Sequence, residues 1–222
     1  MLRFISMAAL LPFVAGCFGP PEEVDFGDPS LLGPLEDVNL APEVPAQDGD
    51  PFPEMLSMVS GEDEENDRYY AHARAWVKAD SAKVWEALRD ADVTADRRAV
   101  DAWDVVEANA LPEFDFSYVV HNEVNDVISV QYDLTWVHEL QDGTLDAPQT
   151  VAIQWSKTDG TGFINLLSGS VVIERVDSGL CEIQLIEHLR AAARDESTLE
   201  AYLEDLYADI LAFVNDEPLP AL

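Results

Sequence analysis

The sequence predicts an α+β fold in which a run of antiparallel strands is followed by one long C-terminal helix. Apolar and polar residues alternate along six segments between residues 69 and 189, which is typical of strands with one buried face. Short joins containing Asp and Gly separate several of these segments, as in β-hairpins. Residues 197–215 then carry apolar side chains at helical spacing.

The first predicted strand covers residues 69–78, where small apolar residues alternate with polar and aromatic ones. Asp80 or Ser81 can cap a short helix directly after it. The apolar side of this helix carries Val84, Trp85 and Leu88. Residues 91–111 are less regular and are expected to hold a further helical turn or two and an edge strand near residues 103–106.

The later strands follow one another with tight joins, which predicts an antiparallel meander. These strands are expected at residues 114–120, 128–136, 151–155, 167–175 and 180–189. Ser197 and Glu200 form a capping-box pattern at the start of the final helix, which is expected to end near Asn215. One side of that helix carries Leu199, Leu203, Leu206, Ile210 and Phe213.

The first 17 residues have the pattern of a secretory signal. A single Arg3 precedes an apolar run that closes on Val14-Ala15-Gly16-Cys17, and a run this short cannot span a bilayer as a helix. The four closing residues resemble the lipobox of bacterial lipoproteins. The resemblance implies cleavage before Cys17, lipid attachment to Cys17, and anchoring in the bacterial cell envelope. Phe18 in place of an aspartate favours the outer membrane. The alternative is an ordinary signal-peptide cysteine and a free mature protein.

Residues 18–67 differ from the rest of the chain. They contain eight of the 13 prolines and 15 acidic residues, with no Lys or Arg. Such a segment buries too little apolar surface to order itself, so we expect a disordered, extended tether. The domain itself is then expected to cover residues 68–222.

The charge balance excludes one class of partner. The chain has 44 acidic residues against 12 basic ones, a net charge of −32. Nucleic-acid binding requires clustered Lys and Arg, so no nucleic-acid partner is predicted. The sequence indicates no particular protein partner.

Residues 76–90 resemble the opening strand and helix of the SRPBCC superfamily, which includes START-like lipid-transfer proteins and polyketide cyclases. The helix there typically carries an apolar residue followed by Trp, as Val84-Trp85 does. Residues 164–175, around Gly169, and the strand at 181–189 fit the later strands of the same superfamily. The resemblance implies a helix-grip fold over roughly residues 69–215, with the sheet curled around the final helix and a cavity between them.

A cavity of this kind binds apolar ligands with a few polar groups for orientation. The residues expected to line it are Tyr132, Trp136, Trp155, Leu185, Glu187, Leu206 and Ile210. Glu187 shares the strand parity of Leu185, so it can point inward as a ligand anchor with a raised pKa. The alternative is that a bulge or the strand end places Glu187 in water.

No sequence motif indicates catalysis. The chain lacks a P-loop, a nucleophile elbow, a zinc-type cysteine pair and a His-Glu-x-x-His motif. Its four histidines, which are His72, His121, His138 and His188, are far apart in sequence. We therefore predict no catalytic residue, no metal site and no cofactor. His138 is expected at the cavity mouth or at an exposed strand end, and Cys181 as a small buried apolar residue.

These observations predict a membrane-tethered protein that binds a hydrophobic small molecule or lipid in the bacterial cell envelope. Two alternatives remain. One is a structural or interaction module whose cavity is filled. The other is an enzyme of the cyclase kind, which the lack of a convergent acid–base set disfavours.

Overall fold

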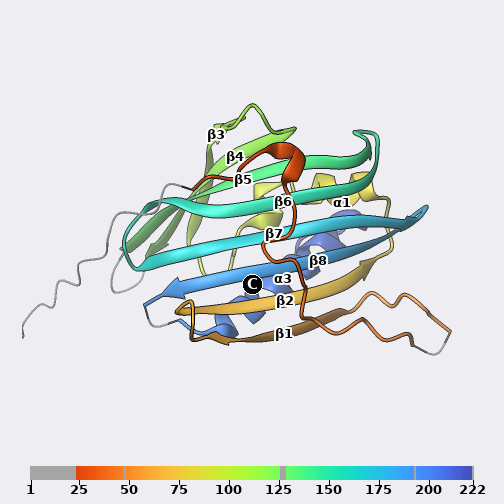
Figure 1. The fold of residues 1–222 in the computed structure, drawn as a ribbon, viewed down its shortest axis with the longest axis horizontal. Helices are drawn as coiled ribbons and strands as arrows, with labels where there is room; N and C mark the ends of the chain where they lie inside the picture. Colours follow the sequence, from red (N-terminus) through yellow and green to blue (C-terminus); the bar gives the residue numbers. More distant parts are fainter. Residues whose placement is uncertain (1–23, 48, 126–128, 193, 222) are drawn as a thin grey trace, which may run out of the picture.

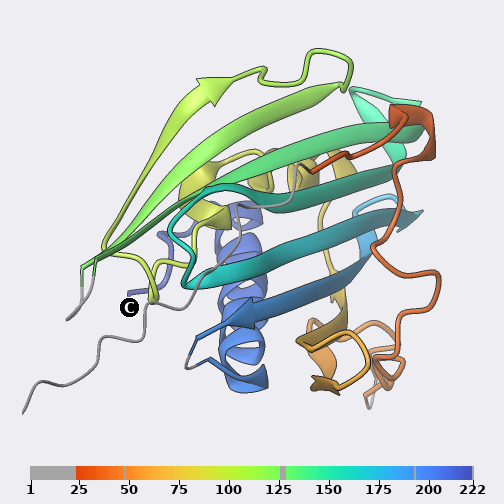
Figure 2. The ribbon, with the colours of Figure 1, turned by 60° about the vertical axis from the view of Figure 1, so that its left-hand side comes forward.

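The structure, a computed structural model, describes residues 24–47, 49–125, 129–192 and 194–221. Within these residues an eight-stranded antiparallel sheet curls around the long helix α3 (Figures 1 and 2). The strand order is β1-β2-β8-β7-β6-β5-β4-β3. The elements are η1 (Pro29–Leu31), β1 (Leu56–Asp63), β2 (Arg68–Val77), α1 (Ser81–Ala87), α2 (Ala91–Thr94), β3 (Ala102–Ala108), β4 (Phe116–Asn125), β5 (Ser129–Thr144), β6 (Ala147–Gly160), β7 (Ile164–Asp177), β8 (Leu180–Ala191) and α3 (Glu196–Val214).

This architecture is the helix-grip fold that the sequence predicts. Strands β3 to β8 form the expected meander, and β3 is an edge strand, as predicted near residues 103–106. The early strand β2 pairs with the last strand β8, with Tyr69 opposite Leu189 and Val77 opposite Cys181. Cys181 is fully buried, as expected.

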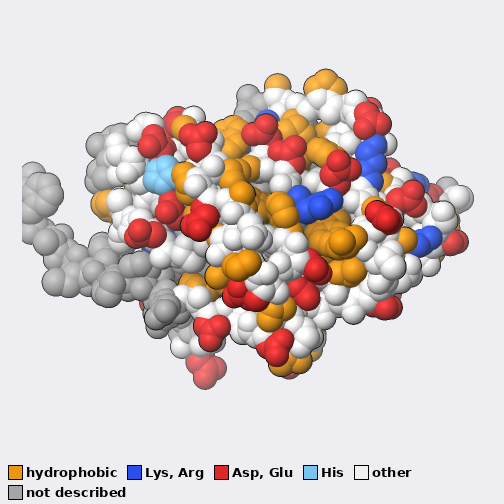
Figure 3. All heavy atoms as spheres, turned by 90° about the horizontal axis from the view of Figure 1, so that it is seen from above, with side chains coloured by type: hydrophobic (Ala, Val, Ile, Leu, Met, Phe, Trp, Pro, Cys, Tyr) orange, Lys and Arg blue, Asp and Glu red, His pale blue; other side chains and the backbone are white. Residues whose placement is uncertain are grey.

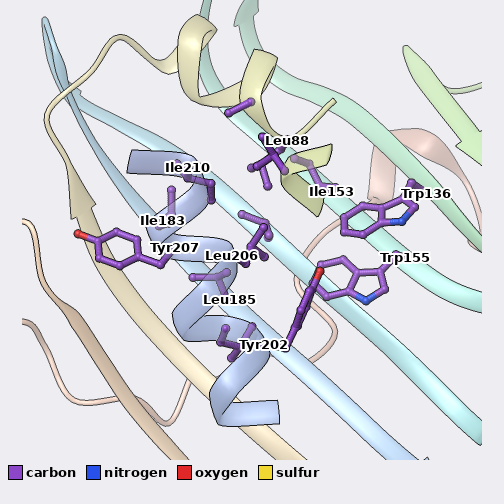
Figure 4. Close-up of a cluster of buried hydrophobic side chains, with 14 of the residues drawn as sticks. Leu88, Trp136, Ile153, Trp155, Ile183, Leu185, Tyr202, Leu206, Tyr207 and Ile210 are labelled. Carbon is purple, nitrogen blue, oxygen red and sulfur yellow. The ribbon is translucent and has the colours of Figure 1, made fainter. Parts of the chain in front are cut away.

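The inward face of β2, the first predicted strand, carries small residues that allow α3 to pack closely. Ala71, Ala73 and Ala75 of β2 all point inward and are completely buried. Their small side chains let α3 pack close to β2, and Leu206 and Ile210 of α3 lie in the core that results (Figure 4). The space between β2 and this part of α3 is therefore filled by packed side chains.

The start of α3 differs from the predicted capping box. Asp195 is the N-cap residue, and its side chain accepts a hydrogen bond from the Ser197 backbone N–H at 3.1 Å. Glu200, which was expected to complete the box, instead accepts a hydrogen bond from the Ser60 hydroxyl of β1. Asp195 satisfies the same unpaired backbone donors, and Glu200 joins the helix to the sheet edge.

The predicted disordered tether is wrong for much of residues 24–67. Residues 56–63 form the edge strand β1, paired with β2. Residues 29–41, which we call the strap, cross the outer face of the sheet from β5 to β2 (Figure 1). The prolines and acids that suggested disorder lie between a few anchoring side chains, and those anchors suffice to order the segment.

Three contacts show how the strap is held. Leu32 is buried in a small cluster with Phe114, Val137 and Ala152. The Leu35 backbone N–H donates to the Ser170 hydroxyl of β7 at 3.0 Å. The Asn39 amide donates to the Ala73 carbonyl of β2 at 3.0 Å. The strap thereby buries part of the outer face of the sheet.

Residues 1–23 and 48, which include the predicted signal, Cys17 and the start of the predicted tether, lie outside the described residues. In the part of the chain that the structure describes, no helix has the length and apolar character needed to cross a bilayer.

Candidate functional site

A cavity of about 530 Å³ lies between the curved sheet and the start of α3. It is bounded by the N-terminal half of α3, the α2 region and the ends of β4 to β8. Its apolar wall includes Val124, Val130, Leu134, Ile164, Leu167 and Leu189. Its polar groups include Thr94, Asp96, Asn122, Glu187, Arg194 and Tyr202. The volume falls within the range of about 300–1,000 Å³ that is usual for small-molecule sites.

Two residues of the cavity wall, Trp155 and Glu187, lie on strands on either side of Gly169. Trp155 of β6 pairs with Gly169 of β7, which pairs with Glu187 of β8. A side chain on Gly169 would overlap the Trp155 ring, because a Cβ there would lie only 1.9 Å from Cζ2 of the indole. The missing side chain therefore lets the indole lie across β7, where its N–H is near enough to the Glu187 carboxyl group to lower the pKa of that group.

Other aromatic rings fix the orientation of this indole. Trp155 stacks on Trp136 with ring centroids 4.5 Å apart and an interplanar angle of 18° (Figure 4). Tyr202 of α3 meets it edge to face, at 6.3 Å. The Tyr202 hydroxyl is itself fixed, because it donates a hydrogen bond to the Thr94 carbonyl at 3.0 Å. The wall around Glu187 is thus preorganised by side chains from β5, β6 and α3.

Glu187 is the most unusual group in the cavity wall. The residue is only 3% exposed, and its Oε2 atom has no hydrogen-bond partner among the described residues. Burial raises the pKa of Glu187 well above its ordinary value, and the nearby Asp96 carboxylate adds to this increase. The uncharged acid is therefore favoured to a higher pH than it would be for an exposed glutamate. Of the two alternatives left by the sequence, the structure supports the inward one.

The structure places three of the predicted lining residues in the cavity wall, namely Tyr132, Trp155 and Glu187. Trp136, Leu185, Leu206 and Ile210 were also expected there, but they lie in the packed core. The physical reason is the row of alanines on β2, because it brings the C-terminal half of α3 against the sheet and leaves no space beside Leu206 and Ile210. Among the described residues, the cavity lies where α3 begins.

Several cavity residues were missed by the sequence analysis. Asn122 follows Tyr118 and Val120 on the inward side of β4, and it is 2% exposed. A polar residue at an inward strand position was a usable signal, had the alternation been followed two residues further. Asp96 and Arg194 lie outside the regular strands and helices, and no sequence period indicates where such residues point.

His138 lies neither at the cavity mouth nor at an exposed strand end, so both expected positions are wrong. The residue is fully buried, and its Nδ1 accepts a hydrogen bond from the Trp85 indole N–H at 3.1 Å. Burial lowers the pKa of His138 to about 3. It is a neutral core residue whose hydrogen bond to Trp85 joins α1 to β5.

Two other histidines do converge, contrary to the expectation from their sequence separation. His72 and His188 lie beside Glu36 of the strap on the outer face of the sheet, with Nε2 atoms 3.6 Å and 2.9 Å from its carboxylate oxygens. The Nδ1 of His72 accepts from the Leu40 N–H at 3.1 Å, and that of His188 lies 2.8 Å from Nη1 of Arg68. Because the Leu40 N–H and the Arg68 guanidinium can only donate, the proton of each neutral ring lies on Nε2. The two Nε2 atoms therefore turn N–H groups toward the Glu36 carboxylate, although neither contact has the geometry of a hydrogen bond, and they offer a metal no lone pair.

Comparisons with known proteins agree with the fold. No protein-family model matches the chain, and no curated protein matches it. Among solved structures, the STAR-related lipid transfer protein of Xanthomonas axonopodis (fragment 25–204) is similar with a TM-score of 0.51 and 13% identity, over 72% of this chain and 92% of that one. At this identity the likeness shows the fold alone.

Two further solved structures are more distant. The lipid transfer and protein localization domain of human StarD13 matches with a TM-score of 0.49 and 14% identity, over 75% of this chain and 85% of that one. The Zhui aromatase/cyclase of Streptomyces sp. R1128 matches with a TM-score of 0.42 and 16% identity, over 72% of this chain and 92% of that one.

Proposed function

We propose that this chain is a membrane-tethered protein that binds a hydrophobic small molecule or lipid in the bacterial cell envelope. The observation that carries the proposal is the cavity of about 530 Å³ beside α3. Its wall is mostly apolar, with a few polar groups at defined positions, which is the usual composition of a site for an apolar ligand. The fold likeness to a protein described as a lipid transfer protein adds support.

Filling the cavity should remove ligand binding without unfolding the protein. Val124 and Val130 face each other on β4 and β5, and both line the cavity. We expect Val124→Trp and Val130→Trp each to reduce binding of the uncharged dye Nile red at least tenfold, because the added ring occupies free space. Titration of the dye by fluorescence measures this, alongside a melting curve for each variant.

Val176→Trp is the matched control, because Val176 is 47% exposed near the β7–β8 turn and lies outside the cavity wall. It should bind the dye like the wild type. A melting temperature within about 4 °C of the wild type would show that the cavity variants fill a void. Absence of dye binding by the wild type, with strong destabilisation by both cavity variants, would contradict the proposal and favour a structural module.

The tethering part of the proposal rests on Val14-Ala15-Gly16-Cys17. Two acyl chains on one cysteine meet the requirement for stable attachment, since a single chain binds only reversibly. We expect Cys17→Ser to abolish labelling by radioactive palmitate in a bacterial host and to move the protein from the membrane fraction to the soluble fraction. A Ser variant that stays with the membranes would place the anchor elsewhere.

A further inference from the structure

One acceptor at the polar end of the cavity is unpaired. Oε2 of Glu187 has no hydrogen-bond partner among the described residues. The neighbouring Tyr202 hydroxyl already donates to the Thr94 carbonyl. Buried polar atoms are nearly always paired, so Oε2 is the place where a ligand donor fits.

The charges around this atom have a consistent sign. Asp96 also lines the cavity, and its charge acts on Glu187 closely enough to raise the pKa of the latter. The basic residue of the wall, Arg194, is exposed between β8 and α3, and its charge acts on Asp96 and Tyr132. The charged group that acts on the buried Glu187 is Asp96, so the surroundings of Glu187 are acidic.

The rest of the molecule reinforces this preference. The chain carries a net charge of −32, and acidic side chains are spread over the face in Figure 3 with few Lys or Arg among them. A potential of this sign attracts cations and repels anions. A fatty acid would bring a carboxylate toward Glu187 and Asp96, whereas an ammonium group would offer N–H donors and the opposite charge.

We infer that the cavity takes an amphiphile with a basic nitrogen, whose ammonium group donates to Glu187, in preference to a fatty acid. This inference rests on the proposed function, since it requires the cavity to hold an apolar ligand. The ammonium form pairs with the Glu187 carboxylate, and any proton that Glu187 holds before binding is released to water. No covalent bond forms or breaks apart from this proton transfer.

The test is displacement of Nile red from the full chain by four ligands with one common tail, kept below their aggregation concentrations. The ligands are dodecylamine, dodecanol, dodecanoate and dodecyltrimethylammonium. For the wild type we expect dodecylamine to displace the dye at a concentration at least tenfold lower than dodecanoate. Dodecylamine should also displace the dye at a lower concentration than dodecyltrimethylammonium, which has the same charge but no N–H donor. This comparison needs no variant.

Glu187→Gln supplies the second test, because it keeps the size of the side chain and an acceptor for Trp155. The variant should still bind dodecanol, while its preference for dodecylamine over dodecanol falls to threefold or less. Glu217→Gln is the control. It removes the same charge at an exposed site beyond the end of α3, and the displacing concentrations of the four ligands should keep their wild-type ratios.

Two outcomes overturn the inference while the proposed function stands. One is a wild type that binds the dye but releases it equally to dodecanoate and dodecylamine. The other is a Glu187→Gln variant that keeps the amine preference. A wild type that binds no dye removes the proposed function and this inference together.

Discussion

Gly169→Ala is expected to destabilise the protein by about 3 kcal/mol, a large change for the addition of one methyl group. The new Cβ would overlap the Trp155 ring, and overpacking of a buried site costs about 1–3 kcal/mol. Moving the ring also takes the indole N–H away from the Glu187 carboxyl group, so we expect the loss to lie at the upper end of this range. Denaturant unfolding measures the loss, and near-UV circular dichroism should show that the stacked Trp136–Trp155 pair is disturbed.

A double-mutant cycle tests the cause. Gly169→Ala should cost much less in a Trp155→Phe background, because the smaller ring withdraws from the space that the Cβ needs. Gly33→Ala is the control, since its nearest heavy atom would be 3.9 Å away, and it should change stability by less than about 0.5 kcal/mol. Equal losses from Gly169→Ala in both backgrounds would show that the indole is not the obstacle.

Arg97→Ala is expected to cost about 3 kcal/mol at pH 8. Arg97 lies in the loop between α2 and β3, and its guanidinium holds Asp209 of α3 through Nε at 3.1 Å and Nη2 at 2.7 Å. The Asp209 side chain is only 5% exposed. Removing one partner of a buried ion pair leaves an uncompensated charge, which typically costs about 3–5 kcal/mol. Because Asp209 can take up a proton and lose its charge, we expect a cost at the lower end of this range.

The stability that Arg97→Ala loses should depend on pH in a definite direction. Burial raises the pKa of Asp209, and the Arg97 guanidinium opposes the increase. Without Arg97 the folded-state pKa rises further above the unfolded value, so the variant binds more protons when folded and loses stability as pH rises. The loss caused by Arg97→Ala should therefore be smaller at pH 5 than at pH 8.

Arg98→Ala is the matched control for this loop. Arg98 pairs with Asp205 of the same helix, but its side chain is 56% exposed, so its loss should cost less than about 1 kcal/mol. Similar costs for both arginines, or a loss for Arg97→Ala that does not change with pH, would contradict the assignment of Asp209 as a buried charge.

The sheet and the final helix could be predicted because their patterns are local. Alternation on β2 or β4 and the helical spacing on α3 depend only on which face is buried. The strap could not be predicted, because its order depends on partners distant in sequence, such as Ser170 for Leu35 and Arg68 for Glu36. Proline and acid content describes the segment alone and says nothing of these partners.

The candidate site was predictable in part for the same reason. Tyr132, Trp155 and Glu187 were found from inward strand parity. Parity cannot distinguish a cavity wall from a packed core, so Trp136, Leu185, Leu206 and Ile210 were placed in the site as well. The difference depends on how closely α3 approaches the sheet along its length, and this is set by Ala71, Ala73 and Ala75 on a strand far from the helix in sequence.

The pairing of β2 with β8 also determines when the protein can fold. The contacts of β2 and of the strap reach 120 and 135 residues along the chain, as for Arg68 with His188 and Leu35 with Ser170. Contacts this distant form slowly, because the loop between them must close first. The pairing of β2 with β8 and the closing of the strap are therefore expected to follow the local hairpins, which include that of β1 with β2.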